Sequence, residues 1–442
     1  MDWLTPQFIT SVVIILIMVH VVLVTVAYLV MAERKISAYI QDRIGPNRVG
    51  FDFGLPALKF LRGALGFGQP LADGIKFLIK EDFTPSRVDK ALFSLAPIIV
   101  IAPALVGFVI IPWGGIWNGV LPILGDVTGG VAVHIAGANV NIGIVYLLAV
   151  ASLGVYGVTL GGWASNNKYS FLGGLRCSAQ MISYEIPLGL ALLAALLAFG
   201  TVVPDSIIRL QVAEGWGVVA QPLAALIFFI AIMAEGNRAP FDNAEAEQEL
   251  VGGYHTEYSS MRFALFFLAE YAHIVTSSAF LVLLFFGGYH VPFIPWLKTM
   301  TSPETMTFGA VLIKFLVYLG KVVLTVCFMM VVRWTIPRLR FDQVMMMAWQ
   351  FVIPVSLVLV VGVSVMVYAG EASTYKLLAM NVAVILLTVM ASPLIPKSTS
   401  NRRLPLYGSR FSAMPGEAVR TQSDEPVALE DRPVEGTTPV AR

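Results

Sequence analysis

The sequence predicts an all-α polytopic membrane protein with about nine transmembrane helices. Hydrophobic residues make up 57% of its 442 residues, and charged residues make up only 13%. The mean hydropathy is +0.78. Apolar runs of about 20 residues recur along the chain, and each is long enough to cross a bilayer as a helix. These observations argue against a soluble enzyme.

The first predicted span covers residues 8–31, which carry no charge. It is too long for the hydrophobic part of a signal peptide and has no basic segment before it, so we expect it to be retained. The segment from Glu33 to Lys90 then carries ten Lys and Arg residues. By the positive-inside rule, this segment is a cytoplasmic loop and the N-terminus lies outside.

Eight further spans are predicted downstream. They cover residues 91–112, 140–162, 175–199, 219–234, 263–286, 308–332, 349–369 and 374–394. The predicted outer loops hold Arg209, Lys298 and Lys376, and the inner loops hold Lys168, Arg176, Arg238, Arg262, Arg333, Arg338 and Arg340. This bias satisfies the positive-inside rule throughout. Residues 1–395 therefore form a transmembrane helical domain, and residues 396–442 form a disordered cytoplasmic tail that is rich in polar residues.

The first cytoplasmic loop contains two groups of basic residues. Arg43 and Arg48 flank the turn Gly45-Pro46-Asn47, which could present them as fixed donors, although simple obedience to the positive-inside rule also explains them. Residues 55–65 and 71–79 have short apolar stripes between lysines and arginines. We expect both to form interfacial amphipathic helices that border an entrance for a lipophilic substrate.

A second loop, from Glu235 to Arg262, is unusually acidic and lies on the same predicted side. Its carboxylates are Glu235, Asp242, Glu245, Glu247, Glu249 and Glu257. Acidic groups this close together beside hydrocarbon should have raised, coupled pKa values, which is typical of proton-handling sites. The alternative is an ordinary solvated loop. Gly252-Gly253, followed by Tyr254, His255 and Tyr258, favours a built site because these residues supply backbone freedom and amphipathic rings.

Several ionisable residues fall inside predicted spans, where each charge costs about 2.5–3.5 kcal/mol. Glu185 lies in the fourth span, and Glu270 shares a helix face with His273 in the sixth. Lys314 and Lys321 are seven residues apart in the seventh span, so they also align, but the sequence gives them no role. These residues either form buried ion pairs that fix helix packing or relay protons. His20, His134 and His290 are isolated and are expected to be packing or interfacial residues.

The two cysteines, Cys177 and Cys327, lie far apart and form no metal-binding spacing. The chain is therefore expected to bind no iron–sulfur cluster and no structural metal, so that electron transfer occurs in a partner.

Two long segments carry a family resemblance. AERKISAYIQDRIGPNRVG and EGNRAPFDNAEAEQELVGGYHTEYSSMRF closely resemble the signature loops of the quinone-site membrane subunit of respiratory complex I. In bacteria this family is called the H subunit of NADH:quinone oxidoreductase, and in mitochondria it is called subunit 1. The resemblance covers essentially residues 1–370 and implies an eight-helix core, so that the ninth predicted helix is an addition.

The resemblance implies a function and a set of site residues. The subunit would form, with the peripheral arm, a chamber for ubiquinone or menaquinone, and would couple quinone reduction to proton translocation in a bacterial plasma membrane. The chamber wall would include Arg34, Lys35, Arg43, Arg48 and Asp73. The proton or charge relay would include Glu33, Glu185, Glu235, Glu245, Glu247, Glu249 and Glu270. Arg238 and Asp242 would order the acidic loop, with Gly252 and Gly253 as its hinge.

The resemblance also implies partners and leaves alternatives open. Its partners would be the peripheral quinone-site and iron–sulfur subunits, neighbouring membrane subunits including antiporter-like ones, and lipid, with flavin and iron–sulfur clusters held elsewhere. The chain departs from the family pattern in a longer segment between Gly50 and Gln69 and in the ninth span. The equivalent subunit of a membrane-bound hydrogenase remains an alternative. So does a stand-alone cation transporter, although no inverted repeat supports it.

Overall fold

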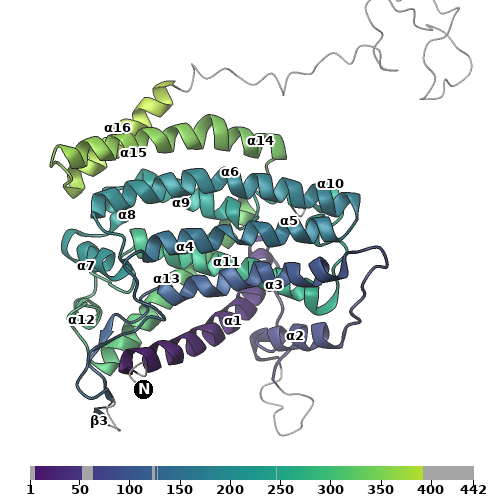
Figure 1. Cartoon of the computed structure of the whole chain (residues 1–442), viewed down its shortest axis with the longest axis horizontal. Coiled ribbons are helices and arrows are strands. Elements are labelled where there is room, and N and C mark those ends of the chain that lie inside the picture. The colour runs from purple at the N-terminus through teal and green to yellow at the C-terminus, as the bar shows by residue number, and fades with distance from the viewer. Residues whose placement is uncertain (1–4, 52–62, 122–124, 127, 245, 392–442) are drawn as a thin grey trace, which may run out of the picture. The chain divides into compact units, whose positions relative to one another are not determined.

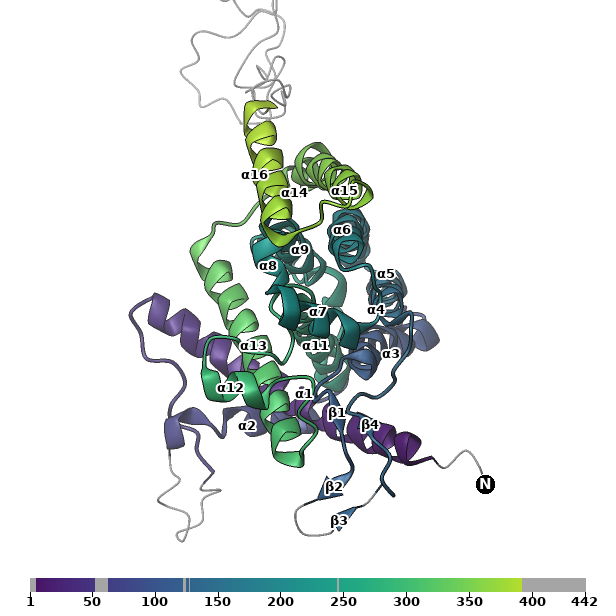
Figure 2. The same cartoon turned by 90° about the vertical axis from the view of Figure 1, so that its left-hand side faces the viewer.

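The structure is a computed structural model that describes residues 5–51, 63–121, 125–126, 128–244 and 246–391. Eight of the described helices are long and apolar enough to cross a membrane, and a ninth apolar helix is shorter. This confirms the predicted all-α polytopic fold. Figures 1 and 2 show the helices from two directions, with several of them nearly end-on in Figure 2.

Helices make up most of the described chain, and long connections follow α1 and η3. The α-helices are α1 (Pro6–Ile40), α2 (Gln69–Ile79), α3 (Lys90–Val106), α4 (Gly143–Ser152), α5 (Gly154–Ala164), α6 (Lys168–Phe199), α7 (Pro204–Glu214), α8 (Gly217–Ala220), α9 (Pro222–Glu235), α10 (Glu247–Leu250), α11 (Ser260–Phe285), α12 (Pro295–Met300), α13 (Phe308–Thr335), α14 (Phe341–Met346), α15 (Ile353–Tyr368) and α16 (Thr374–Ala391). The tighter or wider turns are η2 (Ala64–Gly66), η3 (Gly107–Ile110), η4 (Gly253–His255) and the π-helical η5 (Met347–Val352).

Four two-residue strands form two antiparallel pairs between α3 and α4. They are β1 (Ile116–Trp117), β2 (Val120–Leu121), β3 (Gly125–Asp126) and β4 (Val133–His134). Ile116 pairs with His134 and Val120 pairs with Asp126.

The first helix is longer than the sequence predicted. α1 continues to Ile40, so Glu33, Arg34 and Lys35 belong to a helix rather than to a loop. The segment Ala-Glu-Arg-Lys is composed of good helix formers, which explains the extension. The helix ends just before Asp42, whose φ of 55° is incompatible with an α-helix. The predicted amphipathic helix 71–79 is confirmed as α2, whereas most of the predicted helix 55–65 lies outside the described residues.

Some predicted spans are broken into pieces. The third is α4 followed by α5, and the eighth is α14, η5 and α15, beginning eight residues earlier than expected at Phe341. The fifth is only the 14-residue α9, preceded by the single turn of α8. At about 1.5 Å per residue α9 is about 21 Å long, too short to cross a bilayer by itself.

α11 is the central helix of the core. Its membrane-spanning window is 78% buried, more than that of any other candidate span among the described residues. It packs against α1, α3, α9 and α13. This position explains how side chains in the middle of α11 contact several other helices.

The chain separates into two compact units, Met1–Leu387 and Thr388–Arg442, and the structure describes only the first four residues of the second. Within the first unit, the added helix α16 is tied to α9. The fully buried Asn381 accepts a hydrogen bond from the backbone N–H of Leu223 at 3.2 Å. Since the first N–H groups of a helix lack partners within it, Asn381 serves as a cap for α9.

Candidate functional site

The site begins at the C-terminal end of α9, where Glu235 is the last helical residue. Its carboxylate is only 7% exposed and lies 3.5 Å from Nε2 of His273 in the middle of α11. The imidazole also lies 3.4 Å from the hydroxyl of Ser277, one turn along. An acid and an imidazole in contact at such depth can exchange a proton.

Glu270 lies one turn of α11 away and has two partners from the acidic loop. The phenol of Tyr254 donates a hydrogen bond to Oε1 at 2.6 Å, and Nη2 of Arg238 lies 3.5 Å from Oε2. Arg238 and Glu270 are each about 8% exposed. A buried carboxylate of this kind is tolerable because it is paired and hydrogen-bonded.

Arg238 connects this cluster to a second one. Its guanidinium stands over the ring of Tyr271 at 4.2 Å. The phenol of Tyr271 in turn donates to Glu33 of α1, and Arg333 of α13 forms an ion pair with the same carboxylate. We call the connected set Glu235, His273, Glu270, Tyr254, Arg238, Tyr271, Glu33 and Arg333 the charge chain.

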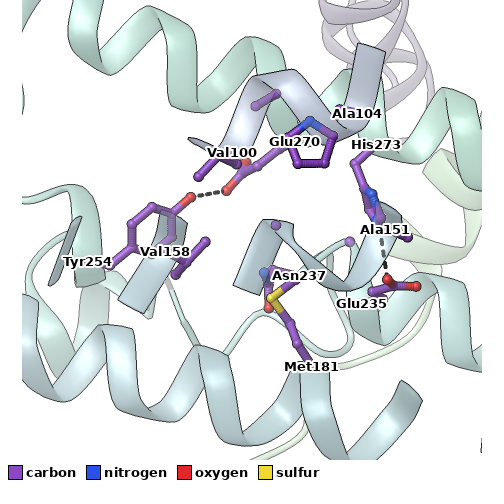
Figure 3. Close-up of a pocket in the computed structure, with 14 residues that line it drawn as sticks. Val100, Ala104, Ala151, Val158, Met181, Glu235, Asn237, Tyr254, Glu270 and His273 are labelled. Atoms are coloured by element: carbon purple, nitrogen blue, oxygen red, sulfur yellow. Dashed lines mark hydrogen bonds and ion pairs between the residues drawn. The ribbon is translucent and has the colours of Figure 1, made fainter. Parts of the chain in front are cut away.

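Two small cavities lie along the charge chain. The first cavity has a volume of about 30 Å³, counted as the space in which the centre of a water molecule fits. It is lined by Glu235, Glu270, His273, Tyr254 and Asn237 (Figure 3). The second offers about 20 Å³ and is lined by Glu33, Arg238, Tyr271 and Arg333. A water molecule needs about 10–15 Å³ measured in this way and two or more polar partners, so each cavity can hold at least one.

The acidic loop is fastened to α6 by Gln180, which is completely buried. Its amide nitrogen donates to the carbonyls of Ala234 at 2.9 Å and Phe241 at 2.7 Å, on either side of Arg238. Asn237 bends the chain with a φ of 49°. These contacts hold the turn that aims Arg238 toward α11.

The two cytoplasmic loops predicted from the sequence touch each other. The hydroxyl of Ser260 donates to the carbonyls of Phe77 and Lys80 at 2.9 and 2.8 Å. Arg262 donates to Thr84 at 2.7 Å and lies 3.5 Å from the carboxylate of Asp82. The end of the acidic loop is thus docked on the segment that follows α2.

The remaining predicted relay residues are distributed differently. Glu185 of α6 is half-buried, and its charge is close enough to that of Glu235 to repel it. Glu249 is exposed and forms an ion pair with Arg176, so it belongs to the surface of the loop. Glu245 lies outside the described residues, and the structure describes the backbone of Glu247 in α10 but not its side chain.

The predicted chamber residues lie around α1 and α2. Arg34 and Asp73 join these helices through an ion pair of 3.0 Å. Lys35 donates to the carbonyl of Leu65 at 2.5 Å. Arg43 and Arg48 are exposed, and Arg43 donates to the amide oxygen of Gln41.

The predicted loop-ordering residues include two glycines with different surroundings. Gly253 has a φ of 66°, which favours glycine, and its backbone lies so close to Gly173 of α6 that a side chain at position 173 would collide with it. A Cβ at Gly252 would lie 3.3 Å from the hydroxyl oxygen of Thr256, a tight contact with a side chain and not with another helix. Gly253 therefore acts in this structure as a packing contact between the loop and α6.

Asp242 is a carboxyl group of the acidic loop whose pKa departs from its ordinary value. Burial raises its pKa to about 6, although Arg338, Arg333 and Arg238 favour the ionised form. Its Oδ1 is buried and has no hydrogen-bond partner among the residues that the structure describes. Because the pKa of Asp242 in the folded protein exceeds that of an unfolded aspartate, about 3.9, folding favours its protonated form.

This sign gives a testable pH dependence. The stabilisation from protonated Asp242 is complete below pH 4 and is lost as the pH rises through 6. Asp242→Asn removes this dependence, so between pH 5 and 7 the wild-type protein should lose about 1 kcal/mol of stability relative to the variant. Thermal unfolding of the two purified assemblies at both pH values measures the difference. Parallel curves would mean that Asp242 does not titrate in this range.

The two aligned lysines of α13 both bond to backbone carbonyls. Lys314 is completely buried and donates to the carbonyl of Thr305 at 2.7 Å. Lys321 donates to the carbonyls of Phe286, Gly288 and His290 at 2.7, 2.9 and 2.8 Å. These carbonyls follow the C-terminal end of α11, where a cation is favoured.

Sequence reasoning misses four residues of the site and does not identify the partner of His273. The sequence marks Tyr254 only as an amphipathic ring, and it gives Tyr271, Gln180 and Arg333 no role in the site. Arg333 pairs with Glu33, which the sequence placed in a loop outside the first span, so the need of a buried carboxylate for a cationic partner gave no signal there. His273 does share a cavity with Glu270, but its ion-pair partner is Glu235.

Comparison with known proteins adds a consistent set of relatives. A family model described as NADH dehydrogenase matches residues 12–364. The NADH-quinone oxidoreductase H 1 subunit of Cytophaga hutchinsonii is 44% identical over 336 residues, which cover 76% of this chain and 90% of the relative. NADH-quinone oxidoreductase subunit 8 of Rhodothermus marinus is 42% identical over 360 residues, covering 80% and 95%. The corresponding H subunit of Leptospira biflexa is 43% identical over 356 residues, covering 79% and 93%. The charge chain lies entirely within the matched residues, whereas α16 lies beyond them.

Proposed function

The chain belongs to the NADH dehydrogenase family that contains the H subunit of NADH-quinone oxidoreductase, and on this premise we propose that it couples quinone reduction to proton translocation. It is a multi-pass membrane subunit of a multi-subunit oxidoreductase, and quinone is the substrate in the names of its relatives. The relatives' names favour this role over that of a hydrogenase subunit or a stand-alone transporter.

The observation that supports the proposal best is the continuity of the charge chain. Five contacts make up the path: Glu235–His273, Glu270–Arg238, Arg238–Tyr271, Tyr271–Glu33 and Glu33–Arg333. His273 and Glu270 are joined by the first cavity, which both of them line. Each carboxylate in the charge chain contacts at least one group that can donate a proton to it or carries a positive charge. Two unit charges 4 Å apart interact by about 4 kcal/mol at an effective dielectric of 20, which is enough to change a neighbour's protonation.

The proposed chamber for the quinone lies beside α1 and α2. Arg34 and Asp73 join these helices, Lys35 supports the segment before α2, and α2 presents the exposed apolar side chains Leu71 and Ile75. An amphipathic helix with such a face is suited to a membrane surface from which a lipophilic quinone arrives. Arg43 and Arg48 are exposed and available to a peripheral subunit.

The proposed coupling runs from this chamber through Glu33. Glu33 sits on the same helix as Arg34, one residue earlier, and bonds to Tyr271 and Arg333 on the other side. A change of charge in the chamber would alter the balance between Glu33 and Arg333. The phenol of Tyr271 and the guanidinium of Arg238 would pass that change to Glu270, and the first cavity lies between Glu270 and Glu235.

The experiment that tests the proposal is Glu235→Gln in the assembled complex. The substitution weakens a hydrogen bond to a charged group, which contributes about 1.5–3 kcal/mol. If that energy is lost from the transition state, proton-coupled quinone reduction should be slower by about tenfold to a hundredfold. NADH oxidation with quinone and proton uptake by reconstituted vesicles are measured together.

The matched control is Glu304→Gln, which makes the same chemical change at an exposed glutamate outside the charge chain. We expect the control to leave both assays unchanged. If Glu235→Gln pumps and reduces quinone as the unmodified complex does, Glu235 has no part in coupling and the proposal loses its first link.

A further inference from the structure

An apolar groove of about 480 Å³ lies at the opposite end of α9 from Glu235, between α9, α11 and α13. Leu226 and Phe229 of α9 form one wall, and Leu324 and Phe328 of α13 form the other. The side chains of Leu226, Leu324 and Phe328 are more than half exposed in this subunit. Because both helices belong to the membrane-embedded part of the chain, the groove faces lipid or a neighbouring subunit.

Two polar groups distinguish the groove from an ordinary lipid-facing surface. The ammonium group of Lys321 lines it, and no acidic side chain of the described residues pairs with that charge. Trp216 also lines it, 4.8 Å from the ammonium, and the indole Nε1 is buried without a hydrogen-bond partner among the described residues. A cation whose partners among the described residues are backbone carbonyls and no carboxylate, together with an unmet N–H donor, favours an occupant that carries negative charge and oxygen acceptors.

The size of the groove favours a thin occupant. A helix with its side chains is about 10–12 Å across, so 480 Å³ would enclose only about one turn of it. An acyl chain is much narrower and can lie along the whole groove. The volume lies within the range of about 300–1,000 Å³ that is usual for small-molecule sites.

We propose that the groove binds one diacyl phospholipid, with an acyl chain between α9 and α13 and its ester and phosphate oxygens beside Trp216 and Lys321. The acyl chain buries the exposed side chains of Leu226, Leu324 and Phe328. An oxygen of the lipid accepts the hydrogen bond of Trp216 Nε1, and the phosphate compensates the charge of Lys321. The site is separate from the charge chain, because it lies at the other end of α9.

Photo-crosslinking on the purified, assembled complex tests the proposal. The probe is phosphatidylglycerol with a diazirine on one acyl chain, and labelled residues are mapped by mass spectrometry of peptides. We expect labelling to concentrate on Leu324 and Phe328 and to be suppressed by excess unlabelled phosphatidylglycerol. Leu312 and Leu316 are the matched controls, because they are about equally exposed on α13 but lie outside the groove.

Two variants separate the groove from its surroundings. Trp216→Phe removes the N–H while keeping a ring, and should lower lipid retention about twofold to tenfold, the usual effect of one hydrogen bond. Ala225→Leu fills the groove from α9 and should abolish the concentrated labelling. Trp296→Phe makes the first exchange at an exposed tryptophan outside the groove and should change nothing.

Three results would overturn the proposal. Equal labelling of Leu324, Phe328, Leu312 and Leu316 would mean that lipid contacts α13 without a site. No labelling in the groove would place a neighbouring subunit there. Labelling that survives Ala225→Leu would show that the probe binds elsewhere, and this variant decides the question even if Trp216→Phe fails to assemble.

Discussion

Replacing Arg238 by methionine is expected to lower quinone-linked proton translocation at least about tenfold and to destabilise the subunit by about 3–5 kcal/mol. Arg238 is the cationic partner of the buried Glu270 and lies over Tyr271, which bonds to Glu33. Methionine is apolar and carries no charge, so Glu270 would lose this cationic partner while the hydrogen bond from Tyr254 stays. A buried carboxylate would then have lost its charged partner, and the charge chain would be cut in its middle.

The measurement compares three variants in reconstituted vesicles, each normalised to the amount of assembled complex. Arg238→Lys keeps the positive charge but loses the planar guanidinium that stacks on Tyr271, so it should retain part of the activity. Arg340→Met is the control, because Arg340 is exposed and lies outside the charge chain. Full activity of Arg238→Met in an assembled complex would rule out a charge connection between Glu270 and Tyr271.

The cost of removing Arg238 follows from where the acidic loop is held. Gln180 fixes the backbone on both sides of the arginine, so the loop cannot easily bring another cation to Glu270. Nearby, Asn243 lies 3.5 Å from the same glutamine through its side-chain amide. In this structure the loop therefore holds one guanidinium beside Glu270, and movement of the loop about Gly252 and Gly253 stays a prediction.

The sequence was sufficient to predict the fold class, the apolar helices and part of the charge chain, but not Tyr254, Tyr271 and Arg333 as members of that chain, nor its connections. Apolar run lengths located the eight described helices that are long enough to cross a membrane and the shorter apolar helix α9. The spacing of three residues placed Glu270 and His273 on one face of α11, where both line the first cavity. The partners of these residues come from elsewhere. Glu235 meets His273, and Glu33 meets Tyr271 and Arg333, across separations of 38, 238 and 300 residues. No local pattern encodes which helices pack together, so these pairs required the tertiary structure.

Glu249 illustrates a limit of a different kind. Its place in a dense acidic stretch made it a natural relay candidate, yet it lies on the surface and pairs with Arg176. Whether a carboxylate points inward depends on the loop path, which is set by the contacts of Gln180 and by the close approach of Gly253 to Gly173. Charge density in the sequence therefore indicates the loop but does not select among its acids.

Lys321 gives the second large effect, and it concerns stability. Its ammonium donates three hydrogen bonds to the carbonyls of Phe286, Gly288 and His290, which would otherwise be left without donors at the end of α11. Lys321→Met keeps the apolar stem but removes all three bonds. Hydrogen bonds to a charged group contribute about 1.5–3 kcal/mol each and are not additive, so we expect a loss of at least about 3 kcal/mol.

Thermal unfolding of the purified complex, monitored by the release of this subunit, measures that loss of stability. Lys376→Met is the control, because Lys376 is half exposed and pairs only with the equally exposed Glu371 among the described residues, an arrangement worth about 0–1 kcal/mol. The number of protons translocated per NADH oxidised should be the same in the assembled Lys321→Met complex as in the unmodified complex, because Lys321 lies outside the charge chain. A stable variant with altered proton stoichiometry would contradict both parts of this expectation and would make Lys321 a participant in proton transfer.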